Sequence, residues 1–70
     1  MTKDMTLFEY LQKRADDKML TYYEFAKEMK MSPNTLYNLK HKKPTIRTYR
    51  KIAAYLDEDP FELREYPIKK

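Results

Sequence analysis

Four neutral hydrogen-bonding side chains lie three or four residues apart in the middle of the chain: Asn34, Tyr37, Asn38 and His41. In a helix, these spacings place side chains on one face. An asparagine amide carries both donors and an acceptor, so two asparagines on such a face can form directional hydrogen bonds with a flat polar edge. No acidic residue lies between positions 29 and 56. The pattern therefore indicates recognition by hydrogen bonding rather than acid–base catalysis.

A dense group of basic residues overlaps the end of this stretch. Six lysines and arginines, and no acidic residue, lie between positions 40 and 51. Residues 20–51 carry eight basic and two acidic groups, whereas residues 52–70 carry three basic and five acidic groups. This one-sided distribution suits contact with a polyanion, because lysine and arginine neutralise phosphates. The alternative is an ordinary solvated basic surface.

The composition offers little for catalysis or cofactor binding. The 70 residues include one histidine, no cysteine and no glycine, which excludes thiolate chemistry, glycine-rich phosphate loops and the usual zinc ligand sets. The longest apolar run, residues 52–56, is far shorter than a membrane span. We therefore expect a cytoplasmic protein that is not an enzyme, with no cofactor, metal, membrane association or small-molecule ligand.

Helix-start signals recur along the chain and divide it into predicted helices. Thr6 and Thr21 each precede a glutamate by three residues, the pattern of a capping box. Ser32 precedes Pro33, a residue favoured at the first helical position, and we expect Ser32 to cap that helix. Thr45 opens a further helix. With the apolar spacing, these signals predict an all-α domain with helices over 7–17, 22–29, 33–40, 46–56 and 61–65.

The two predicted helices over 22–29 and 33–40 are separated by only three residues. So short a turn makes them cross steeply, as in a helix-turn-helix. Leu36 and Leu39 then face the core, and the asparagines face outward. We expect one domain over residues 1–70, packed over 6–65 and with a loose tail over 66–70.

The stretch from Leu20 to Leu63 carries landmarks of a known family. They are Leu20-Thr21, Phe25-Ala26, Met31-Ser32, Leu36 with Leu39, and the sequence IAAYLDEDPFEL. With these landmarks the stretch resembles the lambda-repressor-like domain of the Cro and XRE family of phage and bacterial regulators. The resemblance implies a compact five-helix fold that binds double-stranded operator DNA.

The resemblance also implies which residues contact DNA. Base contacts in the major groove fall to Ser32, Asn34, Tyr37 and Asn38, and asparagine can pair with adenine there. Together with the charge pattern, it implies phosphate contacts for a second set of residues. This set is Thr21, Tyr22, Lys40, His41, Lys42, Lys43 and Arg47.

Three positions depart from the family pattern. Lys30 and Lys42 stand where the family commonly has glycine, and a left-handed backbone at either lysine would be strained by ~1 kcal/mol. Pro33 stands where the family often reads bases with glutamine. Since proline cannot do this, base contacts should shift towards the asparagines.

Several of these residues have alternative roles that the sequence leaves open. Asn34 and Asn38 could be solvated helix polars, and Tyr22 or Tyr37 could pack in or beside the core. His41 could cap the end of its helix, where a positive charge is favoured. The lysines of the following loop could be free surface groups.

The expected function is that of a Cro-like transcriptional repressor from a phage or other mobile element, which occupies an operator and blocks polymerase. A single module of this size distinguishes only weakly between DNA sequences, so we expect a homodimer that binds two half-sites of the operator. Candidates for its interface are Phe61, Tyr66 and Ile68. The alternative is a helix-turn-helix module that binds a protein partner, such as an antirepressor or antitoxin.

Overall fold

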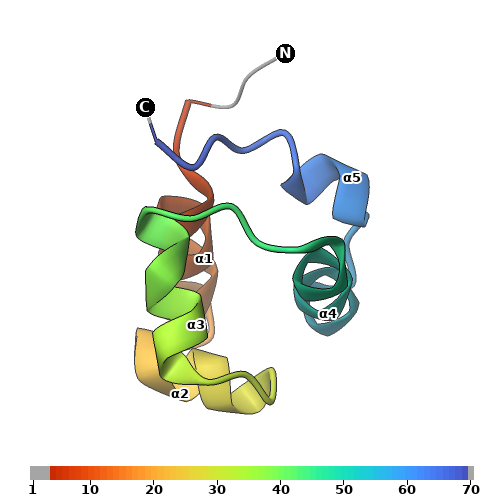
Figure 1. The fold of residues 1–70 in the computed structure, drawn as a ribbon. Coiled ribbons are helices and arrows are strands. Elements are labelled where there is room, and N and C mark those ends of the chain that lie inside the picture. The colour runs from red at the N-terminus through yellow and green to blue at the C-terminus, as the bar shows by residue number, and fades with distance from the viewer. Residues whose placement is uncertain (1–3, 70) are drawn as a thin grey trace.

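The computed structural model describes residues 4–69, and every regular element within them is helical. In Figure 1, α1 to α3 form one side of the molecule, and α4 and α5 form the other. The predicted all-α fold is confirmed, and the helices over 7–17 and 46–56 have the predicted bounds. The elements are α1 (Leu7–Asp17), α2 (Tyr22–Glu28), α3 (Pro33–Tyr37), a 3₁₀ helix η1 (Asn38–Lys40), α4 (Ile46–Leu56) and α5 (Pro60–Leu63).

Local hydrogen bonds fix where the first two helices begin. Thr6 and Thr21 accept the N–H groups of Glu9 and Glu24, and each glutamate accepts the N–H of its threonine in return. Both predicted capping boxes are therefore confirmed. Ser32 behaves differently, since it lies at the N-cap of α3 but its side chain makes no capping hydrogen bond. Its exposed hydroxyl is therefore left for another partner.

Three helices end on left-handed residues that are not glycine. Met19, Lys30 and Asp57 have φ angles of 60°, 58° and 57°. After each, the next N–H returns to a carbonyl one turn back; the N–H of Met31, for example, donates to Ala26 at 2.9 Å. This is the hydrogen bond of a Schellman motif, which glycine usually closes. Of the two lysines that stand where the family commonly has glycine, Lys30 adopts the strained left-handed conformation and Lys42 does not.

Three predicted helices have different bounds in the structure: the one predicted over 22–29 ends one residue earlier, at Glu28, and the other two differ more. The helix predicted over 33–40 is α-helical only to Tyr37, and its last turn tightens into η1. The helix predicted over 61–65 instead begins at Pro60, behind the cap from Asp59, and ends at Leu63. These differences concern the last turn of a short helix, where apolar spacing cannot separate α from 3₁₀ geometry.

One apolar core joins the helices. Leu11 of α1, Phe25 of α2, Leu36 of α3 and Ile52 of α4 each have 0 % of their surface exposed. Ala26 is equally enclosed, and its small side chain lets α3 approach α2 closely. Because Leu36 is held from several sides, the opposite face of α3 is fixed in orientation towards solvent.

The tail expected to be loose is packed in its described part, residues 66–69. The N–H of Leu7 donates to the carbonyl of Pro67 at 2.9 Å, and the ring of Tyr66 stacks on Tyr10 with centroids 4.4 Å apart. Ile68 also packs against the core. The expectation was wrong here because it overlooked apolar side chains that find partners on α1. Lys70 lies outside the described residues.

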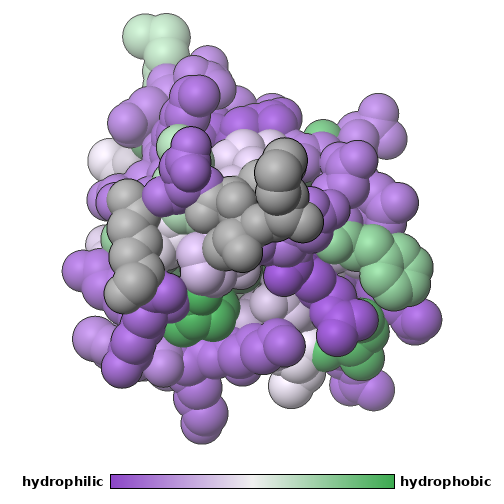
Figure 2. All heavy atoms as spheres, turned by 90° about the horizontal axis from the view of Figure 1, so that it is seen from above, coloured by the Kyte–Doolittle hydropathy of each residue, from purple (hydrophilic) through white to green (hydrophobic). Residues whose placement is uncertain are grey.

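The molecular surface is mostly polar. Seen from above, hydrophilic side chains dominate and apolar ones form separate spots (Figure 2). The most exposed large apolar side chains are Met19 at 92 % and Phe61 at 69 %. Within residues 4–69, no helix has both the length and the apolar character needed to cross a membrane.

Candidate nucleic-acid interface

The turn between α2 and α3 is held by backbone and side-chain contacts. The left-handed backbone of Lys30 reverses the chain, and the carbonyl of Lys30 accepts a hydrogen bond from Lys51 Nζ of α4 at 2.8 Å. Met31 is partly buried beneath the turn. The two helices are thus locked to each other and to α4, as a helix-turn-helix requires.

The outer face of α3 carries the predicted amides. Asn34 and Asn38 are exposed, while Leu36 and Leu39 on the inner face are 0 % and 2 % exposed. Neither asparagine side chain hydrogen-bonds to another described residue, so their donors and acceptors remain open to a ligand. The structure therefore brings the two amides together on one accessible surface.

Tyr37 and Tyr22 lie at the edge of this face, but they differ in exposure. Tyr37 is 44 % exposed, and its ring lies 5.2 Å from the ring of Tyr22 and 6.2 Å from that of Phe8. Tyr22 is only 7 % exposed, and its hydroxyl donates to the carbonyl of Leu36 at 3.2 Å. Burial raises the pKa of Tyr22. Tyr22 is therefore a core residue whose hydroxyl already has a partner inside the domain, which counts against the predicted phosphate contact.

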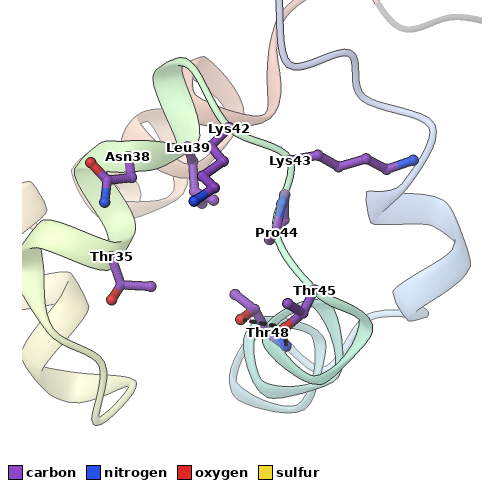
Figure 3. Close-up of a pocket in the computed structure, with 8 residues that line it drawn as sticks. All are labelled: Thr35, Asn38, Leu39, Lys42, Lys43, Pro44, Thr45 and Thr48. Carbon is purple, nitrogen blue, oxygen red and sulfur yellow. Dashed lines mark hydrogen bonds between the residues drawn. The ribbon is translucent and has the colours of Figure 1, made fainter.

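A groove separates α3 from α4, and no carboxylate lines it. Thr35 of α3, Asn38 of η1 and Thr48 of α4 line it, and Lys42 extends into it from the connection between η1 and α4 (Figure 3). It continues towards the α2–α3 turn. The residues lining the continuation are Lys30, Met31, Ser32, Thr35, Arg47, Thr48 and Lys51.

The groove includes threonines that the sequence analysis did not assign to a site. Thr45 was expected only as a helix cap, and Thr35 and Thr48 were not singled out. In the structure Thr45 does accept the N–H of Thr48, and the two hydroxyls lie 3.2 Å apart at the start of α4. The signal available in the sequence was the lack of any acidic residue in the first turn of α4, which leaves a helix N-terminus open to an anion.

The cations that are predicted to contact phosphates do not form one continuous positive surface. Lys42, Lys43 and Arg47 line the groove, and the side chain of Lys43 extends beyond it towards α5 (Figure 3). Lys40 turns to the other side, where its Nζ lies 4.7 Å from the centre of the Phe8 ring. His41 is exposed just after η1. None of these side chains forms an ion pair within residues 4–69, where the one ion pair joins Arg14 to Glu58.

Thr21, the remaining predicted phosphate contact, stands beside an acidic group. Its N–H donates to Glu24 at 3.0 Å, and its hydroxyl accepts the N–H of that residue. These bonds with Thr21 lower the pKa of Glu24, so the carboxylate stays charged. A phosphate at Thr21 would be repelled by it.

Potential metal ligands are not gathered anywhere in residues 4–69: no group of three or more acidic or histidine side chains could hold an ion. What the structure does assemble is a steeply crossed helix pair with an amide-bearing outer face beside a cationic groove. This arrangement defines a helix-turn-helix DNA-binding domain.

Comparison with protein families agrees with this class. Residues 10–69 match the family of the Cro/C1-type HTH DNA-binding domain. The chain belongs to this family, which confirms the resemblance drawn from its landmarks and makes DNA binding and transcription regulation its class of function. Searches of curated proteins and of solved structures gave no match.

Proposed function

We propose that this chain is a Cro-like repressor that recognises an operator in double-stranded DNA by placing α3 in the major groove. The supporting observation is the exposed pair Asn34 and Asn38, whose amides are unengaged and lie beside a groove without carboxylates. Asparagine can pair with adenine through two hydrogen bonds, and the major groove admits a helix. A bound protein would repress by obstructing polymerase.

In this proposal the groove between α3 and α4 receives a backbone phosphate. Ser32 stays among the expected base contacts. For the phosphate, Lys42 and Arg47 supply charge and the hydroxyl of Thr48 supplies a directional hydrogen bond. Such contacts fix the register of α3 on the duplex and make affinity depend on salt. Tyr37 and Asn38 then meet base edges, while His41 and Lys43 follow the backbone beyond the groove.

A homodimer would supply the discrimination that one short α3 lacks. Its two copies of α3 would lie ~34 Å apart, one turn of DNA. Phe61 on α5 is the best-placed apolar contact, since 69 % of it is exposed. Tyr66 and Ile68 are withdrawn from the expected interface, because they pack within the chain.

Selection from a pool of random duplexes tests the proposal. We expect a two-fold symmetric consensus containing A·T pairs at fixed positions. An asymmetric consensus would reject the homodimer, and binding without any consensus would reject base reading. Failure to bind any duplex at low salt would reject the function and favour a helix-turn-helix module that binds a protein partner.

A further inference from the structure

The helix that bears Asn34 and Asn38 changes its geometry between Tyr37 and Asn38. It is α-helical up to Tyr37 and a 3₁₀ helix from Asn38 to Lys40. In the 3₁₀ part each N–H donates three residues back instead of four. In a continuous α-helix the N–H of Lys40 would donate to the carbonyl of Leu36, whereas in a 3₁₀ turn an N–H reaches only three residues back.

A tyrosine hydroxyl from α2 donates to the carbonyl of Leu36. Tyr22 donates to Leu36 O at 3.2 Å from within the core. Its ring is held by Phe8, with centroids 4.6 Å apart, and by the edge of Tyr37. A phenylalanine would fill this space equally well, so the hydroxyl adds something beyond packing. It satisfies a buried carbonyl at the point where the geometry changes.

We propose that Tyr22 is a positioning residue for the base-reading face. Its hydroxyl ties the carbonyl of Leu36 to α2, and so fixes how the face that bears Asn34 and Asn38 is turned relative to the rest of the domain. The N–H of Asn38 donates to the carbonyl of Asn34, which keeps these two residues in α-helical register, and the 3₁₀ geometry follows them. This inference rests on the proposed function, because the orientation matters only if both amides meet bases.

The substitution Tyr22→Phe tests this role, because it removes the hydroxyl and keeps the ring. We expect affinity for the duplex selected by the wild type to fall about tenfold, the size of one lost base contact. Affinity for a scrambled duplex and the salt slope should stay unchanged, since the phosphate contacts remain. Anisotropy titrations on both duplexes measure this, and circular dichroism checks the fold.

Tyr10→Phe is the matched control. It removes a partly buried tyrosine hydroxyl that is bonded to Glu58, away from α3. We expect the control to keep the wild-type ratio of affinities. The same loss of discrimination in Tyr10→Phe, or an equal loss on both duplexes in Tyr22→Phe, would overturn the positioning role. A wild type without discrimination would instead overturn the proposed function.

A second measurement begins with the wild-type protein. In its NMR spectrum the Tyr22 hydroxyl proton should exchange slowly and show cross-peaks to the backbone around Leu36 and Tyr37. Tyr22→Phe should shift the amide resonances of Lys40 and His41, and Tyr10→Phe should leave them in place. A rapidly exchanging hydroxyl in the wild type would overturn the inference even if the variant failed to fold.

Discussion

Where α1 meets the connection between α4 and α5, Tyr10, Arg14 and Glu58 are bonded to one another, and Tyr66 stacks on Tyr10. In the groove between α3 and α4, Asn38 and its neighbours make few bonds within the described chain. In the first region the polar side chains hold α1 to the connection between α4 and α5. The second region leaves the side chains of Asn38 and Lys42 at the surface without a hydrogen-bond partner among residues 4–69. In this small fold, the side chains that stabilise the domain are therefore bonded within it, whereas those proposed to recognise DNA lie at the surface of the groove.

The largest expected effect concerns the groove. Asn38→Ala should cost about 1–3 kcal/mol on the selected operator and relax the preference at one base pair, because a bidentate contact is lost. Competition titrations against single-base operator variants measure this. Gln12→Ala, which removes an exposed amide from α1, should leave the preference intact. An equal loss on every sequence would show that Asn38 does not read bases.

Replacing the left-handed residues Met19 and Lys30 by glycine tests fold stability and DNA binding separately. Met19→Gly and Lys30→Gly should each raise the free energy of unfolding by about 1 kcal/mol, because glycine adopts positive φ without a steric penalty. Denaturant titration measures both. Only Lys30→Gly should also weaken DNA binding, since Lys30 lines the groove. Destabilisation by both glycines would contradict this account of the helix ends.

A smaller effect is expected from a single phosphate contact. Lys42→Ala should weaken binding to all duplexes alike and reduce the salt slope by roughly one unit. The plot of affinity against salt concentration provides the slope. Lys42→Arg should retain the slope, and Lys13→Ala on α1 should not alter it. A slope unaffected by Lys42→Ala would remove Lys42 from the phosphate contacts.

The smallest effect concerns the bonded region at high pH. Burial, followed by the bond to Glu58, raises the pKa of Tyr10 from 10.0 to about 12. The neutral phenol thus stabilises the fold below pH 10, and this contribution disappears as the pH rises towards 12. The stability gap between the wild type and Tyr10→Phe, measured by urea unfolding, should shrink over that range. A constant gap would mean that Tyr10 titrates alike in the folded and unfolded chains.

The orientation of the proposed recognition residues could be predicted from the sequence where it depends on the geometry of a single helix. The outward placement of Asn34 and Asn38 follows from their spacing relative to Leu36 and Leu39, and the structure has them exposed. The burial of Tyr22 did not follow, because a tyrosine early in a helix can face DNA or the core. Which direction it takes depends on Phe8, fourteen residues away in sequence, whose ring lies 4.6 Å from it.

The sequence by itself determined the helical class of the protein and the starts of α1 and α2. Capping boxes such as Thr6 with Glu9 close over three residues, so no distant contact is needed to form them. Only the tertiary structure decided the groove between α3 and α4, the 3₁₀ end of the reading helix and the packed tail. These features depend on side chains far apart in sequence, whose pairing is set by packing in the assembled core.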